Sequence, residues 1–258
     1  MTNGPPIVLV VAGNDPSGGA GIGADIQAIT AAGAHPAPVI TALTVQDTVN
    51  ASAVEPVPPR LVADQMRAVL ADVPVAAVKI GLLATAGIAA AVAAVLEPWP
   101  DTPLVLDPVL VAAGGARLSE EALVDVLLDR LCPRTTLLTP NAHEIRRLAP
   151  DEADGDARAR RLLARGCRWV LAKGGDEAGD EIVNRLYGGG AEPHVLRWPR
   201  LPGAFHGSGC TLASACAARL ALGDDVPAAV AAGQALTQRW LAAAFTPGRG
   251  QSIPLRRP

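Results

Sequence analysis

The stretch AAVKIGLLATAGIAAAVAAVLEPWPDTPLVLDPVL, residues 76–110, contains the pattern that determines the fold class. Residues 76–83 and 103–110 are short and almost uninterrupted apolar runs, whereas residues 85–98 are rich in alanine and have the length of a helix. Apolar runs of this kind predict strands that are covered on both faces, and the helix between them predicts a parallel pair. The stretch therefore predicts a strand–helix–strand unit.

The same alternation continues along most of the chain. Further strands are predicted at residues 7–13, 38–46, 135–141 and 167–175, and further helices at residues 24–34, 59–72, 119–133 and 157–166. Right-handed crossovers then place helices on both faces of the sheet. The predicted fold class is α/β, a three-layer α/β/α sandwich with a mostly parallel central sheet.

The last third of the chain departs from this alternation. Residues 176–202 predict a hairpin around a run of three glycines, and two apolar helices follow, the second near 227–245. The tail at 246–258 is expected to be loose. Because there is no internal repeat and no linker, residues 1–258 are expected to form a single domain.

The composition narrows the classes of function. Half of the 258 residues are apolar, 18% are charged, and the formal net charge is −3. The apolar and charged fractions argue against a disordered chain, and the slightly negative net charge gives no indication of a basic surface that would bind nucleic acid. The four cysteines form no CxxC pair, so a reduced cytosolic setting is expected rather than a metal or disulfide scaffold. The N-terminal apolar run is too short for a signal peptide or a membrane span.

Polar and glycine-containing motifs follow the predicted strands. They read GNDPSGGAG, LDPV, TPNAHE and AKGGD. Ligands of open α/β sheets bind beyond the carboxyl ends of the strands. We therefore expect these motifs to converge on one edge of the sheet.

The glycines after the first strand also fit a dinucleotide-binding pattern. Gly19, Gly21 and Ala24 match G-x-G-x-x-G/A, and Asp47 follows at a plausible distance. In that fingerprint the first glycine follows the strand directly, whereas here NDPSG separates it from Gly13. A nicotinamide site is therefore a weak hypothesis beside two others, a loop that folds over a ligand and a purely structural glycine loop.

The motif GSGC opens the first of the two apolar C-terminal helices. Backbone N–H groups without intrahelical partners lie at a helix start, and glycines allow close approach, so Gly207, Ser208 and Gly209 predict an anion hole. Ser208 acting as the N-cap is the structural alternative. Cys210 falls in the first turn, where the helix dipole is expected to lower the thiol pKa and favour a base or a nucleophile. A structural cysteine stays open as well, and nothing in the sequence directs His206 toward the thiol.

Three other strand ends carry charged or amide side chains. Asn141 and Glu144 fit a capping box, but a carboxylate at this position could also hold Mg²⁺ through water. Asp107 is a second carboxylate, and Lys173 is one of only two lysines in the chain, the other being Lys79. A lysine at a strand end can simply extend to solvent. An anion hole, a lysine and two carboxylates together are nevertheless the groups that phosphoryl transfer requires.

The chain resembles the hydroxymethylpyrimidine/phosphomethylpyrimidine kinase family of the ribokinase-like superfamily over most of its length. The motifs that carry the resemblance are, in order, AGNDPSGGAGIGAD, VITALTVQDT, VKIGLL, VLDPVLVAAGGARL, LTPNAHE, VLAKGG and HGSGCTLASACAA. The resemblance implies a kinase that uses ATP and Mg²⁺ to phosphorylate 4-amino-5-hydroxymethyl-2-methylpyrimidine and then its monophosphate, in thiamine biosynthesis. It also implies small-molecule partners only, no nucleic acid or membrane, and a cytoplasmic homodimer.

The resemblance assigns roles to individual residues. It implies that Gly207, Ser208 and Gly209 form the anion hole and that Cys210 takes the proton from the substrate hydroxymethyl group. It further assigns Lys173 and Asn141 to ATP and phosphate, Asp107 and Glu144 to magnesium, and Gly13, Asp15, Gln46 and Leu82 to the pyrimidine.

Three positions depart from the pattern of that family. Leu82 stands where Met is frequent, GAF at 203–205 replaces a more polar stretch, and Asn184 stands where Asp is frequent. These departures bear on the identity of the substrate more than on the reaction type. Pyridoxal kinase, whose substrate also carries a hydroxymethyl group on an aromatic ring, and a noncatalytic pyrimidine sensor stay open as alternatives.

Overall fold

The computed structural model describes residues 4–110, 122–190 and 192–258, and the strands within these ranges form one sheet. The strands are β1 (Ile7–Asn14), β2 (His35–Gln46), β3 (Ala51–Pro56), β4 (Val75–Ile80), β5 (Leu104–Leu106), β6 (Leu137–Leu138), β7 (Trp169–Ala172), β8 (Glu181–Tyr187) and β9 (His194–Pro199). Their order in the sheet is β3-β2-β1-β4-β5-β6-β7-β8-β9. The six central strands, β2, β1, β4, β5, β6 and β7 in sheet order, run parallel. Strand β3 at one edge and β8 and β9 at the other pair antiparallel with their neighbours.

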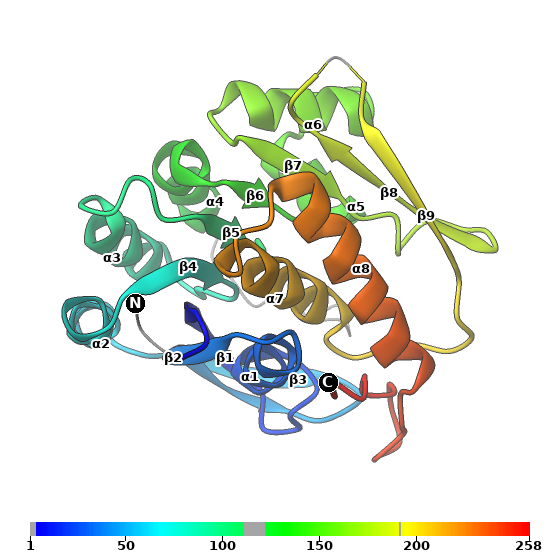
Figure 1. The fold of residues 1–258 in the computed structure, drawn as a ribbon, viewed down its shortest axis with the longest axis horizontal. Coiled ribbons are helices and arrows are strands. Elements are labelled where there is room, and N and C mark those ends of the chain that lie inside the picture. The colour runs from blue at the N-terminus through cyan, green and yellow to red at the C-terminus, as the bar shows by residue number, and fades with distance from the viewer. Residues whose placement is uncertain (1–3, 111–121, 191) are drawn as a thin grey trace.

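Helices cover both faces of this sheet (Figure 1). They are α1 (Gly21–Ala31), α2 (Pro59–Asp72), α3 (Ala86–Leu96), α4 (Ala122–Val126), the π-helical η1 (Leu127–Leu131), the 3₁₀ turn η2 (Cys132–Arg134), α5 (Ala142–Leu148), α6 (Gly155–Ala164), α7 (Ser208–Ala221) and α8 (Val226–Ala242). One apolar cluster joins the sheet to α1, α7 and α8, and a larger one joins its other face to α2, α3, α4, α5 and α6. The predicted three-layer α/β/α sandwich is confirmed.

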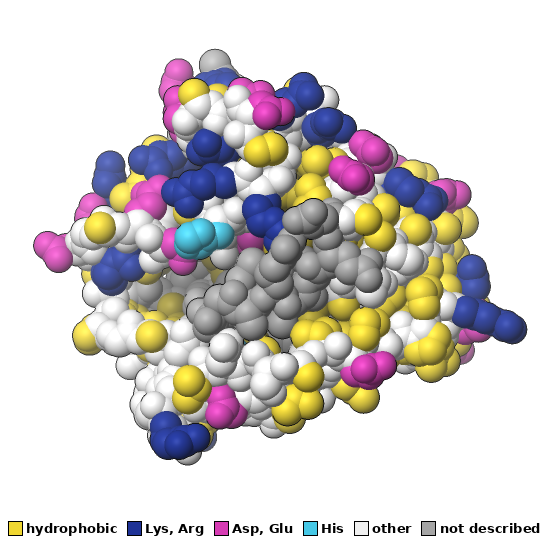
Figure 2. Space-filling model, turned by 180° about the vertical axis from the view of Figure 1, so that it is seen from behind, with side chains coloured by type: hydrophobic (Ala, Val, Ile, Leu, Met, Phe, Trp, Pro, Cys, Tyr) yellow, Lys and Arg dark blue, Asp and Glu magenta, His cyan; other side chains and the backbone are white. Residues whose placement is uncertain are grey.

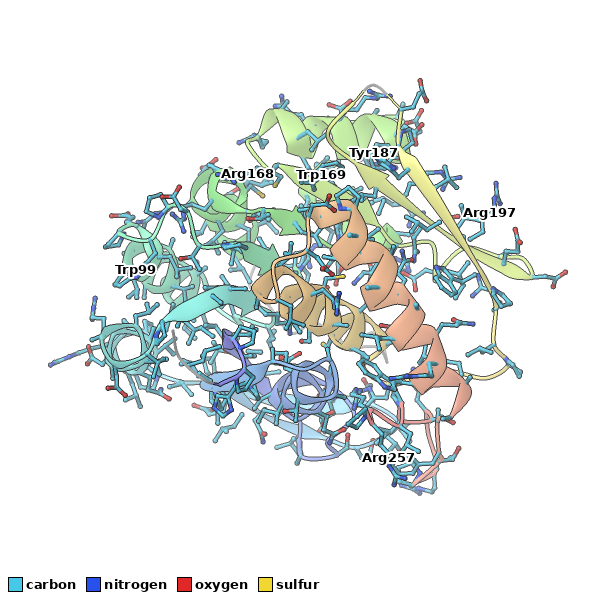
Figure 3. The ribbon with its side chains drawn as sticks, viewed as in Figure 1. Trp99, Arg168, Trp169, Tyr187, Arg197 and Arg257 are labelled. Atoms are coloured by element: carbon cyan, nitrogen blue, oxygen red, sulfur yellow. The ribbon has the colours of Figure 1, made fainter. Side chains whose placement is uncertain are left out.

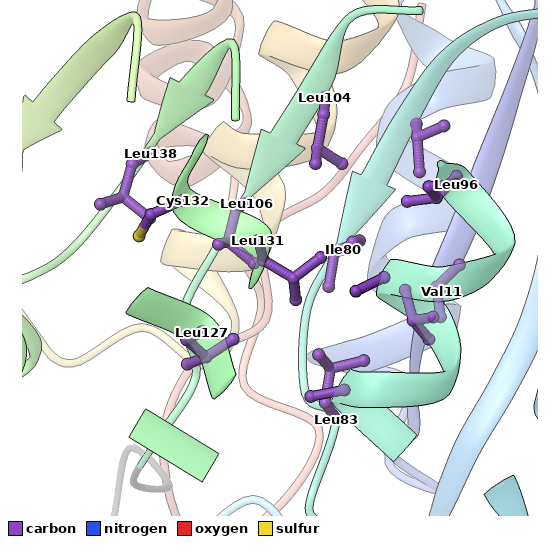
Figure 4. Close-up of a cluster of buried hydrophobic side chains, with 14 of the residues drawn as sticks. Val11, Ile80, Leu83, Leu96, Leu104, Leu106, Leu127, Leu131, Cys132 and Leu138 are labelled. Carbon is purple, nitrogen blue, oxygen red and sulfur yellow. The ribbon is translucent and has the colours of Figure 1, made fainter. Parts of the chain in front are cut away.

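Alternate residues of one strand enter the two clusters. Leu9 and Val11 of β1 belong to the larger cluster, whereas Val8 and Val10 belong to the other. Figure 4 shows part of the larger cluster, where strand side chains such as Ile80 and Leu106 face Leu96, Leu127 and Leu131 of the covering helices. Because successive side chains of a strand point to opposite faces, a strand buried on both sides has to be apolar throughout. This is why the strands could be predicted from uninterrupted apolar runs.

Some boundaries differ from the prediction. Strand β3 was not expected, because ASAVEP has no apolar run and forms an exposed antiparallel edge next to β2. The strand predicted at 103–110 ends at Leu106, where Asp107 and Pro108 turn the chain away from the sheet. Of the helix predicted at 119–133, residues 119–121 lie outside the described residues.

The C-terminal tail is not loose, so that expectation is wrong. Ile253 pairs with Phe245 and is buried, and Arg256 is 7% exposed. Arg256 donates from Nε to Thr211 Oγ1 (2.9 Å), from Nη1 to Gln27 Oε1 (3.2 Å) and from Nη2 to the carbonyl oxygen of Gly19 (2.6 Å). These partners are distant in sequence, so the tail itself gave no sign of its docking.

The surface carries mixed charge. On the face shown in Figure 2, acidic and basic side chains are interspersed, in agreement with the small net charge of −3. Among the described helices, none combines the length and the hydrophobicity that crossing a membrane requires.

Replacing Arg256 by alanine is expected to lower the free energy of unfolding by about 1.5–3 kcal/mol, because buried acceptors lose charged donors. The shift of the urea midpoint at constant slope measures this effect. Arg257, labelled in Figure 3, is the matched control because it is exposed. Its hydrogen bond from Trp240 Nε1 goes to the backbone carbonyl oxygen, which the substitution keeps. We expect Arg257→Ala to change the stability by less than about 0.5 kcal/mol. Equal shifts for the two variants would show that the guanidinium of Arg256 does not hold the tail.

Candidate active site

All of the residues assigned to a site from the sequence line one cavity of about 800 Å³ at the carboxyl ends of the parallel strands. They are Gly13, Asp15, Gln46, Leu82, Asp107, Asn141, Glu144, Lys173, Gly207, Ser208, Gly209 and Cys210. The expected convergence on one edge of the sheet is therefore observed. The same cavity is also lined by residues for which no role was predicted, including Thr44, Lys79, Arg146, Arg147, His206 and Gln251.

A smaller cavity adjoins the first. It shares Asn141, Lys173, Ser208 and Gly209 with the large one and extends toward Trp198 and other residues of β8, β9 and α8. In its wall, Asn184 accepts from the backbone N–H of Gly174 (2.8 Å) and donates to Gln234 (2.5 Å). Asn184, which departs from the family pattern, therefore makes buried structural contacts in the wall of this cavity.

The start of α7 leaves its first backbone N–H groups available. Gly207, not Ser208, is the N-cap, and no side chain of the described residues caps this end, so the alternative that Ser208 acts as the N-cap is wrong. Gly207 has φ = 71°, and a Cβ on it would lie 2.0 Å from the carbonyl oxygen of Gly19. Only glycine fits there. Gly207, Ser208, Gly209 and Cys210 all line the cavity, and the role of this turn as an anion hole stays a prediction.

Cys210 is half-buried and lines the cavity, and the pKa of its thiol is raised to about 11. Burial is the main cause, and the nearby charges of Asp107 and Asp25 raise the pKa further, whereas the ammonium of Lys79 opposes them. The pKa is therefore raised and not lowered as expected, because burial disfavours the thiolate. His206 contacts Asp15 and Gln46.

Lys173 and Asp107 form an ion pair in the middle of the cavity. Lys173 Nζ donates to Asp107 Oδ1 over 2.9 Å, and Thr139 Oγ1 donates to the same oxygen over 3.0 Å. Burial alone would raise the pKa of Asp107, but the ammonium groups of Lys173 and Lys79 hold it below its usual value. Burial alone would lower the pKa of Lys173, but the carboxylates of Asp107 and Glu144 raise it. Both groups are therefore charged at neutral pH.

Asn141 and Glu144 form a complete capping box at α5. Asn141 Oδ1 accepts from the N–H groups of His143 and Glu144, and Glu144 Oε2 accepts from the N–H of Asn141 (2.8 Å). Glu144 is 5% exposed, and burial together with the negative charge of Asp107 raises its pKa to about 7 despite the opposing charge of Lys173. The capping alternative is confirmed, while metal binding by Glu144 stays a prediction. No group of three or more His, Cys, Asp or Glu side chains in the described ranges is arranged around a common metal position.

The glycine loop after β1 is organised by Asp15. Its carboxylate accepts from Ser17 N (2.9 Å), Ser17 Oγ (3.0 Å) and Ala20 N (2.8 Å). A Cβ on Gly19 would lie 2.2 Å from His206 Cδ2, and one on Gly21 would lie 2.3 Å from the carbonyl oxygen of Gly13. Contacts within the protein therefore account for these glycines, and the dinucleotide pattern is not needed to explain them.

Leu82 forms part of the apolar wall of the cavity. It is 7% exposed and packs with small side chains such as Ala42 and Ala84. A Cβ on Gly13 would lie 2.9 Å from Leu82 Cδ2, so the two residues predicted to hold the ring are in contact.

A buried ion pair beside the site was missed. Lys79 is fully buried, and its Nζ donates to both carboxylate oxygens of Asp25 at 2.7 and 2.8 Å, while Ser214 Oγ donates to Asp25 Oδ1 at 2.7 Å. Burial alone would lower the pKa of Lys79, but the carboxylate of Asp25 raises it. The scarcity of lysine was the one sequence signal, and nothing in the sequence marked Asp25 as its partner.

Comparison with known proteins agrees with this geometry. A model of the family described as phosphomethylpyrimidine kinase matches residues 15–255. The chain is 41% identical over 251 residues to the hydroxymethylpyrimidine/phosphomethylpyrimidine kinase of Streptomyces coelicolor, covering 95% of this chain and 92% of that protein. It is 44% identical over 228 residues to the thiamine biosynthesis bifunctional protein ThiED of Geobacter sulfurreducens, covering 87% of this chain but only 46% of that longer protein.

Solved structures of similar proteins include two kinds of kinase. The pyridoxal kinase of Bacillus subtilis, in its ADP complex, matches with a TM-score of 0.88 at 27% identity, over 98% of this chain and 97% of that one. The phosphomethylpyrimidine kinase of Clostridium difficile 630 matches with a TM-score of 0.77 at 32% identity, over 89% and 96% of the two chains. With a family match over residues 15–255 and relatives above 40% identity along most of its length, this chain belongs to the phosphomethylpyrimidine kinase family.

Proposed function

We propose that this protein phosphorylates 4-amino-5-hydroxymethyl-2-methylpyrimidine and then its monophosphate, with ATP as the donor, in thiamine biosynthesis. The observation that carries the proposal is the meeting of the GSGC turn, Lys173 and Asp107 in one cavity of a chain from this kinase family. The relatives named hydroxymethylpyrimidine/phosphomethylpyrimidine kinase, which match along nearly their whole length, support the choice of substrate.

The start of α7 and Lys173 are placed to hold the transferring phosphoryl group. A Cβ on Gly209 would lie 3.0 Å from Lys173 Nζ, so the ammonium lies against the first turn of the helix. Backbone N–H groups and an ammonium aimed at one point stabilise the charge that develops on equatorial phosphoryl oxygens. Gly209 keeps this space open, since any side chain there would meet the ammonium.

Asp107 and Glu144 are suited to Mg²⁺ by the chemistry of their oxygens. The hydrogen bonds from Lys173 and Thr139 fall on Oδ1 of Asp107, and the bond from Asn141 falls on Oε2 of Glu144. Each carboxylate therefore has a second oxygen that can accept from a metal-bound water. A bound Mg²⁺ would supply positive charge to the phosphate oxygens of ATP.

Cys210 is proposed as the base for the first phosphorylation. It would accept the proton of the hydroxymethyl group as that oxygen attacks the γ-phosphorus and the bond to ADP breaks. Only the thiolate can do so, and the ammonium of Lys79 favours the thiolate against burial and the charges of Asp107 and Asp25. In the second phosphorylation the acceptor is already an anion, so it needs no base.

An ATP-consumption assay with Mg²⁺ tests the proposal when hydroxymethylpyrimidine, its monophosphate and pyridoxal are offered side by side. Turnover of both pyrimidines with little turnover of pyridoxal is the expected result. Pyridoxal is included because the likeness in fold to pyridoxal kinases is close. A preference for pyridoxal would move the function to vitamin B6 salvage, and tight pyrimidine binding without turnover would favour a sensor.

We further propose a cytoplasmic homodimer. The described cysteines are all free, which fits a reducing compartment. Leu43, Val45 and Val49, in β2 and the turn after it, are 51–64% exposed, and such a patch fits a subunit contact. Sedimentation should give twice the 26.3 kDa chain mass, and a monomer at micromolar concentration would overturn the dimer.

Replacing Cys210 by alanine should reduce kcat for the first phosphorylation by about 100-fold or more and that for the second by less than about tenfold. The first phosphorylation by the unsubstituted enzyme should also accelerate as pH rises from neutrality, because the Cys210 thiol, with a pKa of about 11, is mostly protonated at lower pH. Cys216→Ala is the control, since this buried thiol on the same helix does not line the large cavity. Equal losses in both steps would contradict the role as base.

Replacing Lys173 by methionine should reduce kcat by about 100- to 1,000-fold, because a cation facing the transferring group is lost. Arg168→Met is the control, since Arg168 is exposed at the amino end of the same strand, next to Trp169 (Figure 3). Circular dichroism of both variants checks the fold. If the activity of Lys173→Met were within tenfold of that of the unsubstituted enzyme, Lys173 would not be the cation that stabilises the transferring phosphoryl group.

A further inference from the structure

Three side chains from distant segments meet at one wall of the large cavity, and the proposed reaction uses none of their mutual contacts. His206 Nε2 lies 2.8 Å from Asp15 Oδ2 and 3.0 Å from the amide nitrogen of Gln46. Asp15 and His206 are 5% and 4% exposed, whereas Gln46 is only half-buried. Of these three hydrogen-bonded side chains, Gln46 is therefore the one that a ligand can reach.

Asp15 can only accept hydrogen bonds. It accepts from Ser17 N, Ser17 Oγ and Ala20 N, in addition to its contact with His206. Burial alone would raise the pKa of Asp15, but the hydrogen bonds from His206, Ser17 and Ala20 hold it below its usual value. An ionised carboxylate has no proton to give, so the proton between Asp15 and His206 has to be on Nε2 of the imidazole.

The other ring nitrogen agrees with this placement. Nδ1 of His206 is buried and has no hydrogen-bond partner among the described residues. If the proton were on Nδ1, a buried N–H would be orphaned, and the bare Nε2 would face a carboxylate. The imidazole ring lies against the backbone of Gly19, where a Cβ would be 2.2 Å from Cδ2.

This proton placement determines which end of the Gln46 amide faces His206. With Nε2–H on the imidazole, the amide nitrogen of Gln46 at 3.0 Å would bring two N–H groups together. The oxygen and nitrogen of an amide have nearly the same shape, so the hydrogen-bond partners decide between them. A half-turn of the amide puts its oxygen against His206, where it shares the single Nε2–H with Asp15 Oδ2 in a bifurcated hydrogen bond. The NH₂ group then takes the place of the amide atom that lies 3.3 Å from Thr44 Oγ1.

Thr44 accepts this arrangement. Its hydroxyl donates to the carbonyl oxygen of Asn14 over 2.8 Å, which leaves lone pairs to accept from the NH₂ group of Gln46. One amide hydrogen then points to Thr44, and the second is free for the cavity. With this direction of the amide, the N–H of His206, the hydroxyl of Thr44 and the amide hydrogen directed at Thr44 each have an acceptor.

We propose that Asp15 and His206 are positioning residues that fix the direction of the Gln46 amide, so that the cavity presents an N–H donor to the bound ring. The pocket then selects a ring with an in-plane acceptor, such as a pyrimidine nitrogen, over a ring with C–H or N–H at that point. A site built around a specific hydrogen bond rejects a ligand that leaves its buried group unpaired. The identity of the ring rests on the proposed function, whereas the direction of the amide does not.

The first test therefore needs no ligand. Nitrogen NMR of protein labelled with ¹⁵N-histidine reports which ring nitrogen carries the proton, and the chain has only four histidines. The His206 signals are assigned by their loss in His206→Asn. We expect Nε2 of His206 to be protonated. A bare Nε2 with a protonated Nδ1 would overturn the proposal, whatever reaction the protein catalyses.

The second test changes the atom that faces the cavity. Gln46→Glu keeps an oxygen against His206 but replaces the proposed donor by an acceptor, so binding of hydroxymethylpyrimidine should weaken by about tenfold or more by calorimetry without ATP. If the amide had the opposite direction, an oxygen would face the cavity in both forms, and binding would change little. Gln251→Glu is the control, because it adds the same charge to the wall of the same cavity.

The outcomes separate the two proposals. A loss for Gln46→Glu that exceeds the loss for Gln251→Glu supports the fixed amide, and equal losses overturn it. If the unsubstituted protein does not bind hydroxymethylpyrimidine at all, the proposed function fails, and the NMR result alone decides the amide direction.

Discussion

Burial of both faces of the parallel strands is the constraint on which the rest of this structure depends. Helices on either side require the strands to be apolar along their length, so polar side chains can gather only where the strands end. Asp107 follows β5, Asn141 follows β6 and Lys173 follows β7 for this reason. The start of α7 meets the same edge, and these groups together form one cavity between the two helical layers.

The low-dielectric surroundings determine how the charges in this cavity behave. Two ammonium groups, those of Lys79 and Lys173, lie against the carboxylates of Asp25 and Asp107, so each of these four charges has a partner before any ligand binds. Cys210 is a further buried group, and burial raises its pKa although the ammonium of Lys79 opposes this. A helix dipole acting alone would lower it. At this helix start, desolvation is the larger effect.

The sequence predicted the sheet, its covering helices and the membership of the cavity, because periodicity and strand-end motifs are local signals. It did not predict contacts that join distant segments. Asp15 was assigned to the pyrimidine by resemblance, but no signal in the sequence showed that its carboxylate holds its own loop and His206. Asp25 ends the motif AGNDPSGGAGIGAD, but nothing in the sequence indicated that it pairs with Lys79, which is 54 positions away. The tail was misjudged for the same reason, because the partners of Arg256 lie up to 237 residues away.

The phosphate end and the ring end of the cavity are held together by backbone contacts. Gly207 caps α7 and packs on the carbonyl group of Gly19, and the same carbonyl oxygen accepts from Arg256, which also binds Thr211 in the first turn of that helix. The loop that carries Asp15 and the helix start that carries Cys210 therefore cannot shift independently. In a reaction whose acceptor oxygen is only two bonds away from the ring, the recognition of the ring restricts the place of that oxygen. A rigid link between the two ends turns hydrogen bonds at the ring into alignment at the phosphorus, and the buried arginine of the tail is part of that link.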